Sequence, residues 1–278
     1  MMMKSNSKTI VAILIIAMLL LTSSCSYNTS SSKNRAKIES YSQQILQQTA
    51  RNISIKAEEI EKTCMEIMFS QTIQDGIKSF SGSDEYEILM YTNEINNLLV
   101  NNFIIDQYVS SATIIINSDS NIMYGESRVV KNKDILNRVT KNTGDFAWIP
   151  ISINNTNLIV VSKEIRDIAS GDKLGTFFIE LKESYFSSIY KSIDYGSDSS
   201  VFIIDSSGIV VSTTDSELEV AKEYKEKTLT DRIIQEKSPN EKRAFTMDIS
   251  GVNEFVVYDY IKSLDWYIVG VVPTESMF

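Results

Sequence analysis

The sequence predicts an α+β fold in which one long N-terminal helix precedes two copies of the same module, each an antiparallel sheet of about five strands with covering helices. Three observations support this prediction. Residues 34–70 have helical periodicity and contain neither glycine nor proline. After this stretch the periodicity changes to short runs rich in β-branched residues. Three of these runs recur later in the same order, which is typical of a duplicated unit.

The first segment has the pattern of a bacterial secretory signal. Lys4 and Lys8 precede twelve consecutive apolar residues, whereas a transmembrane helix needs about 20. Cys25 follows small polar residues and resembles the lipidated cysteine of a lipobox. We therefore expect a signal peptide over residues 1–25 and a lipid anchor on Cys25, with an uncleaved signal anchor or simple secretion as alternatives. All three place the body of the protein outside the cytoplasm, and the two anchored forms place it on the extracytoplasmic face of the cell membrane.

The next element is a helix long enough to hold several structural units together. A helix of 37 residues would be about 55 Å long, and it is stable only if something packs along it. Its apolar or small residues recur every three or four positions and form one stripe: Ile38, Tyr41, Ile45, Thr49, Ile53, Ala57, Ile60, Cys64 and Ile67. We expect this spine helix to carry both modules. Cys64 is expected to be a core residue rather than a disulfide partner of Cys25.

The duplicated unit consists of a hairpin, a short helix and three further strands. In the first run of each copy, two β-branched strands flank an Asn/Asp-Ser turn, which predicts a β-hairpin. The corresponding runs are residues 112–124 and 201–212, 158–165 and 255–261, and 174–181 and 266–272. Short helical segments follow the hairpins at 133–141 and 228–237, and strands are expected near 146–149 and 243–249. Coincidence between generic β runs is the alternative, but agreement of three runs in order favours duplication.

These patterns divide the chain into consecutive segments. The expected boundaries are a signal peptide at 1–25, a spacer at 26–32, the spine helix at 33–80, a membrane-distal module at 83–182, a helical link at 183–198 and a membrane-proximal module at 199–275.

The composition excludes several classes of function. The chain has no histidine, so His-based catalysis and His-ligated zinc or haem are excluded. Ser162 and Lys163 are adjacent on a predicted strand and point to opposite faces, so they cannot form a Ser-Lys pair. No Gly-rich phosphate loop is present. A net charge of −9 without a basic cluster argues against nucleic acid. We expect no enzymatic activity, no cofactor and no metal.

Several motifs together resemble a known family. They are Ser42-Gln43-Gln44-Ile45, the runs at 146–150 and 162–167, Gly175 with the following FFIEL, and the runs at 202–212 and 265–273. This pattern, over about residues 33–275, resembles the double Cache (dCache) domains, whose two tandem modules are PAS-like. It is similar to the ectodomains of YesM-type sensor histidine kinases of Firmicutes. The resemblance implies an extracytoplasmic, non-catalytic protein that binds a small molecule and takes part in signal transduction.

The chain departs from that pattern in two ways. A receptor would continue after Pro273 through a transmembrane helix into a kinase, whereas this sequence ends at Phe278. Amino-acid-binding members carry an arginine two residues before a Trp-Tyr pair. Here Phe146 and Ile149 stand at the arginine and tyrosine positions around Trp148, which argues against an amino-acid ligand.

The distal module is expected to hold the ligand between its sheet and the loops above it. Four residues are predicted to line this pocket: Tyr124, Trp148, Lys163 and Asp167. Trp148 could stack on an apolar or sugar face, and Lys163 and Asp167 could hold a polar group. In the alternative interpretation, Trp148 is a core residue, Lys163 is solvated and Asp167 begins a turn.

The expected function is therefore that of a membrane-anchored sensor that signals through a partner. The alternatives are the sensing ectodomain of a truncated or split receptor, either a histidine kinase or a chemoreceptor, and a lipoprotein that delivers a substrate to a transporter.

Overall fold

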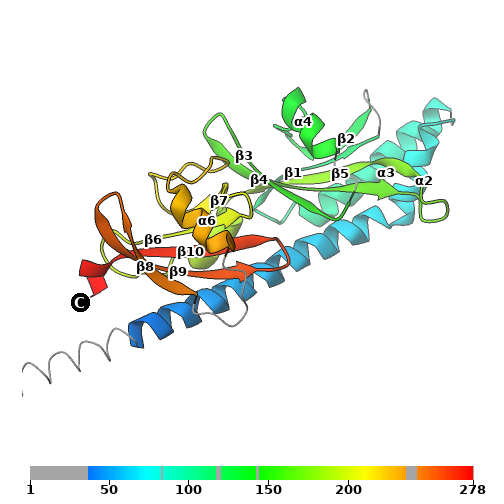
Figure 1. Cartoon of the computed structure of the whole chain (residues 1–278). Helices are drawn as coiled ribbons and strands as arrows, with labels where there is room; N and C mark the ends of the chain where they lie inside the picture. Colours follow the sequence, from blue (N-terminus) through cyan, green and yellow to red (C-terminus); the bar gives the residue numbers. More distant parts are fainter. Residues whose placement is uncertain (1–36, 83, 117–119, 142–143, 236–242, 278) are drawn as a thin grey trace, which may run out of the picture.

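A long helix supports two similar modules. The computed structural model describes residues 37–82, 84–116, 120–141, 144–235 and 243–277. Within this range the helix spans residues 37–68, and both modules pack along one side of it (Figure 1). The predicted stripe is buried from Thr49 to Ile67, and Cys64 is 1% exposed. None of the helices among the described residues is both long and apolar enough to cross a bilayer.

The spine segment expected over residues 33–80 contains two helices that meet near Ser70. The long helix ends at residue 68, and α2 (Gln71–Ser79) begins after Ser70, whose hydroxyl accepts a hydrogen bond from the Ile73 amide at 3.4 Å. Buried Gln74 holds this bend, because its side chain donates to the carbonyls of Met68 at 3.0 Å and Arg166 at 3.1 Å. The position of α2 therefore depends on a contact with a strand more than 90 residues away along the chain.

The distal module contains five antiparallel strands in the order β2-β1-β5-β4-β3. Its elements are α3 (Glu85–Phe103), β1 (Val109–Ile115), β2 (Asn121–Gly125), α4 (Lys133–Thr140), β3 (Ala147–Ile153), β4 (Thr156–Arg166) and β5 (Lys173–Lys182).

The proximal module repeats this arrangement, with strand order β7-β6-β10-β9-β8. Its elements are α5 (Ser184–Tyr190), β6 (Ser200–Asp205), β7 (Val210–Thr213), α6 (Lys227–Gln235), β8 (Ala244–Ile249), β9 (Val252–Ile261), β10 (Trp266–Pro273) and the 3-10 helix η1 (Thr274–Met277). The predicted α+β fold with two duplicated modules is thus confirmed. Gly208 closes the β6–β7 hairpin at φ +80°, and its amide donates to the Asp205 carbonyl at 3.0 Å.

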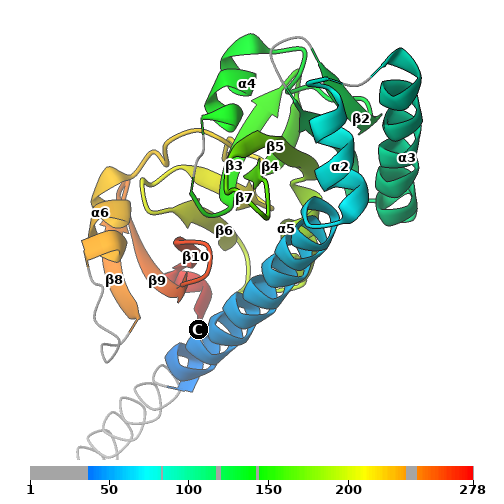
Figure 2. The same cartoon turned by 90° about the vertical axis from the view of Figure 1, so that its right-hand side faces the viewer.

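The two faces of the distal sheet are covered differently. The long helix, α2 and α3 cover one face, which we call the helix face, and α4 lies over the other, the α4 face (Figures 1 and 2). The helix face is apolar, with Ala112, Phe177 and Ile179 in its core. The core of the α4 face is smaller and includes Val160 and Phe178. Residues that are paired across strands point to the same face of a sheet. The strand register therefore also places several buried polar residues on the α4 face: Ser111, Thr113, Ser162, Glu164, Thr176 and Glu180.

Candidate functional site

A cavity of about 540 Å³ lies between α4 and the α4 face of the distal sheet. This volume is in the range of small-molecule pockets. Helix α4 contributes four residues spaced for one helical face, which are Lys133, Leu136, Asn137 and Thr140. The strands contribute Ile115, Asn121, Lys173, Gly175 and Thr176, and the loops Ile116 and Val130. The lining combines aliphatic side chains with amides, hydroxyls and two lysines, a composition suited to a small ligand that has both apolar and polar parts.

The floor of the cavity is set by the register of three adjacent strands. Ile115 of β1 pairs with Asn121 of β2 on one side and with Thr176 of β5 on the other. Paired residues point to the same face of a sheet, so these three side chains stand in one row. Gly175 permits the close approach of β1 and β5, because a Cβ there would lie 2.5 Å from the Ile115 carbonyl oxygen.

The loop that leads into α4 is tied to the sheet by the fully buried carboxylate of Glu180. Glu180 accepts hydrogen bonds from the Ser127 hydroxyl and from the amides of Arg128 and Val129, both at 3.1 Å. Ser127 in turn accepts from the amide of Val130, a lining residue, at 3.1 Å. Since a buried carboxylate is stable only when donors surround it, these bonds hold one wall of the cavity in place.

The cavity has a positive electrostatic character in an acidic protein. Lys133 and Lys173 line it, and none of its described lining residues is acidic. The nearest buried carboxylate on this face belongs to Glu164, which pairs with Thr176 across the strands and is 5% exposed. Glu164 forms ion pairs with Arg166 at 2.8 Å and with Lys173 at 3.8 Å. The chain as a whole carries a net charge of −9, so a cavity with a cationic lining is a local exception.

Two buried hydroxyls on the same face have no hydrogen-bond partner among the described residues. They belong to Ser111 and Thr113 of β1, both of which are fully buried. Thr113 lies two residues from Ile115, a lining residue, and beside Phe178 in the strand register. Unpaired buried hydroxyls are energetically costly, so this part of the α4 face retains polar groups that the fold itself does not use. In the described part of the chain, no cluster of residues could hold a metal ion.

The structure does not bring together the four residues predicted to bind ligand, and none of them lines this cavity. Three lie on the helix face, since their register partners belong to its core. These pairs are Tyr124 with Ala112, Trp148 with Val161, and Lys163 with Phe177. Tyr124 and Trp148 are on the two opposite edge strands of the sheet.

Trp148 joins the two modules to the long helix. Its Nε1 donates to Glu61 Oε1 on that helix at 2.8 Å, and its ring packs edge-on against Phe186 and Trp266, with centroids 5.8 and 5.9 Å away. Lys163 lies elsewhere, where its Nζ donates to the Gly144 carbonyl at 3.3 Å. The position of Trp148 agrees with the alternative interpretation of this residue as part of the core.

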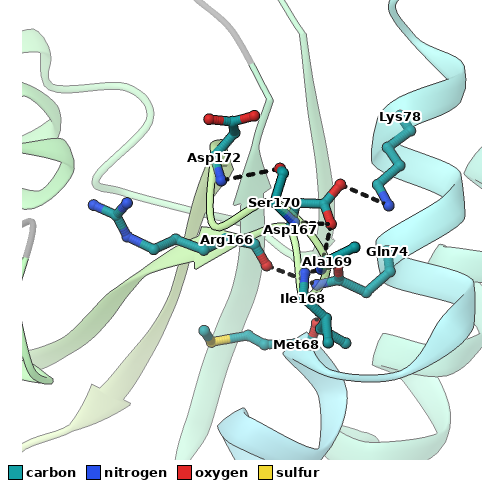
Figure 3. Close-up of polar contacts among 9 residues, drawn as sticks. All are labelled: Met68, Gln74, Lys78, Arg166, Asp167, Ile168, Ala169, Ser170 and Asp172. Atoms are coloured by element: carbon teal, nitrogen blue, oxygen red, sulfur yellow. Dashed lines mark hydrogen bonds and ion pairs between the residues drawn. The ribbon is translucent and has the colours of Figure 1, made fainter.

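Asp167 links the β4–β5 turn to α2, as Figure 3 shows. Its Oδ1 accepts from the amides of Ala169 at 2.7 Å and Ser170 at 3.3 Å, and Oδ2 forms an ion pair with Lys78 at 2.8 Å. The hydrogen bond from Lys78 and the two turn amides lower the pKa of Asp167 below its ordinary value. Gln74 reaches the same turn from α2, and its Oε1 accepts from the Ile168 amide at 3.2 Å. These contacts give Asp167 a structural role in the turn.

The sequence contained one sign of the cavity, the face of the helix predicted at 133–141, but the residue types on that face do not by themselves indicate a binding site. The predicted helix at 133–141 has polar residues and one leucine at 133, 136, 137 and 140, which form one face. In isolation such a face is read as solvated. Lys173 is even less conspicuous, because it stands at the first position of a strand.

The chain matches the family model described as Cache domain (dCache_1) over residues 32–278. None of the curated proteins matches it.

Several solved structures have a similar fold. The ligand-binding domain of the Pseudomonas fluorescens chemoreceptor CtaA, in complex with L-isoleucine, has a TM-score of 0.59 at 14% identity, with 88% of this chain and 95% of that chain covered. The domain of the Pseudomonas aeruginosa amino acid chemoreceptor PctC, in complex with GABA, has a TM-score of 0.54 at 18% identity (84% and 99% covered). The periplasmic sensory domain of the Campylobacter jejuni chemoreceptor Tlp1 has a TM-score of 0.61 at 14% identity (87% and 98% covered). At these identities the likeness is one of fold.

Proposed function

This chain belongs to the Cache domain family, and we propose that it is an extracytoplasmic sensor protein that binds a small molecule in the cavity beside α4. The observation that carries the proposal is the cavity itself, an open pocket of about 540 Å³ between a helix and a sheet with a mixed polar and apolar lining. The ligands named for CtaA and PctC, L-isoleucine and GABA, are molecules of a size that such a cavity could hold. The likeness to YesM-type kinases stays a prediction from the sequence.

The cavity is built before any ligand arrives, which favours binding. Glu180 holds the loop that supplies Val130, and Asn132 caps α4 by accepting a hydrogen bond from the Ile135 amide at 3.2 Å. Binding therefore does not have to bear the entropic cost of ordering this wall. We propose that the protein binds its ligand without transforming it, since the described lining contains no carboxylate or histidine to act as a general base.

A thermal-shift screen of the full chain with sugars, carboxylates, amino acids and amines tests the proposal. A ligand at 100 times its dissociation constant stabilises the folded state by about 2.7 kcal/mol. For a chain of this size that corresponds to a rise in Tm of roughly 5 °C or more. Asn137→Trp fills the cavity from an exposed position on α4 and should abolish the shift. Asp134→Trp, on the same helix but outside the lining, is the matched control. A hit that persists in Asn137→Trp would remove the assignment of this cavity.

Membrane attachment is a separate proposal, because residues 1–25 and Cys25 lie outside the described residues. We propose a lipid anchor on Cys25, on the strength of the preceding apolar run and small residues. Mass spectrometry of the membrane-bound protein should find a diacylated N-terminal peptide that begins at Cys25. An intact peptide spanning the apolar run would instead support the uncleaved anchor. Signalling would then pass to a partner such as a sensor kinase.

A further inference from the structure

We infer that the ligand of the α4 cavity is an organic carboxylate that carries no ammonium group. This inference rests on the proposed function of the cavity and specifies the chemistry of its ligand. It follows from three features of the lining: which charges are present, which charges are already neutralised, and how the apolar residues are distributed.

The first feature is an excess of positive charge, contributed by one lysine of α4 and one lysine of β5. Lys133 opens α4, and Lys173 opens β5 on the opposite side of the cavity. In the described contacts Lys133 has no ion-pair partner, and Lys173 has only the distant contact to Glu164 at 3.8 Å. The N-terminal end of α4 adds a positive dipole beside Lys133. An anion in the cavity would thus gain charge-assisted hydrogen bonds that a neutral molecule cannot form.

The second feature is that the buried carboxylates on this face already lie beside cations or hydrogen-bond donors of the protein. Glu164 forms ion pairs with Arg166 and Lys173, whose two positive charges exceed its single negative charge, although neither of its oxygens has a hydrogen-bond partner among the described residues. Glu180 is bound to a hydroxyl and two backbone amides. An ammonium group needs a carboxylate or several carbonyl oxygens to compensate for its lost hydration. The described lining offers no free carboxylate, so a zwitterionic amino acid would bring an uncompensated charge next to two lysines.

The third feature is an apolar part of suitable size. The lining includes four aliphatic side chains, which are those of Ile115, Ile116, Val130 and Leu136. The amides of Asn121 and Asn137 and the hydroxyls of Thr140 and Thr176 can donate to a carboxylate oxygen. A carboxylate with a short aliphatic or aromatic body therefore matches both parts of the lining. L-isoleucine and GABA, the ligands named for CtaA and PctC, each also carry an ammonium group.

Isothermal titration of the full chain with matched probe sets tests this inference. Each set contains a carboxylate, the corresponding amino acid and the corresponding amine: isocaproate, L-leucine and isoamylamine; hydrocinnamate, L-phenylalanine and phenethylamine; propionate, L-alanine and ethylamine. In the set that binds best, the carboxylate should bind at least about tenfold more tightly than its two counterparts, which is about 1.4 kcal/mol. Lys133→Gln and Lys173→Gln should each weaken its binding about tenfold, and Lys173→Arg should weaken it less.

Controls separate a local charge effect from a general one. Lys62→Gln removes an exposed lysine on the long helix and should leave the affinity unchanged. An amino acid that binds more tightly than its carboxylate counterpart, or binding that is insensitive to both lysine substitutions, would overturn the inference. If that binding is still lost in Asn137→Trp, the proposed function of the cavity stands and only the ligand class is wrong. If no probe of any charge binds, both the ligand class and the cavity assignment are refuted.

Discussion

The clearest test of how the cavity is built is the substitution Glu180→Gln. Glu180 is fully buried, and its Oε1 accepts from the Ser127 hydroxyl and the Val129 amide, while Oε2 accepts from the Arg128 amide. Glutamine has nearly the same shape but only one acceptor oxygen. Its amide nitrogen must therefore face at least one donor that the carboxylate satisfied.

The magnitude follows from these three bonds. A hydrogen bond to a charged group contributes about 1.5–3 kcal/mol, and an orphaned buried amide costs about 1–3 kcal/mol. Glutamine retains an acceptor for Ser127 and Val129 and loses the one for Arg128. Relief from burying a charge offsets part of the loss. We expect the free energy of unfolding to fall by about 2–3 kcal/mol.

Urea denaturation followed by circular dichroism measures this change. Glu126→Gln is the matched control, because Glu126 stands in the same loop but its side chain is 79% exposed and its ion pair with Lys131 is at the surface. An exposed pair contributes about 0–1 kcal/mol. Glu180→Gln should also weaken ligand binding, since the wall that carries Val130 is released. Equal stability of the two variants would refute the view that Glu180 holds this wall.

Three further outcomes are expected. Gly175→Ala should lower the free energy of unfolding by about 1–3 kcal/mol in urea denaturation, because the new Cβ would lie 2.5 Å from the Ile115 carbonyl oxygen. Gly144→Ala should not, since a Cβ at that position would meet no atom within 4 Å. Trp148→Phe should lower the free energy of unfolding by about 1–3 kcal/mol, because it loses the hydrogen bond to Glu61 and has a smaller ring. Glu61→Gln keeps an acceptor and should lower it by less than about 1 kcal/mol; equal effects of the two substitutions would contradict this role of Trp148. The pKa of Asp167 is lowered by Lys78, so its contribution to stability is present above the unfolded pKa of about 3.9 and is lost as the pH falls through the lower folded value. Lys78→Met should therefore lower the Tm above pH ~4 and approach the Tm of the unaltered chain in acid; a Tm difference that is absent above pH ~4, or that does not shrink in acid, would contradict this.

Local periodicity was sufficient to predict most of the elements. The helices predicted at 133–141 and 228–237 are α4 (Lys133–Thr140) and α6 (Lys227–Gln235). The helical and strand periods act over a few residues, so they can be read without knowing the rest of the chain. The duplication was visible for the same reason, because each copy repeats the same local patterns in the same order. The stretch of helical periodicity ends at residue 70, close to the end of the long helix at residue 68, but the contact of Gln74 with the carbonyl of Arg166 on a distant strand could not be read from this pattern.

The candidate site could not be located in this way. Alternation along a strand shows which residues share a face, but it does not show which helix covers that face. Trp148 and Lys163 were selected for their chemistry, and the tertiary structure places them on the helix face, away from the cavity. Lys133 and Lys173 are 40 residues apart, and only the packing of α4 over the start of β5 puts them around one cavity.

The sequence by itself determined the long helix, the duplicated α+β modules and the lack of histidine chemistry, because periodicity and composition are local properties of a chain. The tertiary structure decided how α2 is held after the long helix, which face of the distal sheet carries the cavity, and which charges meet there. These are consequences of contacts between distant segments. Three helices cover the apolar helix face of the sheet, whereas α4 and its preceding loop are the described segments that cover the more polar α4 face.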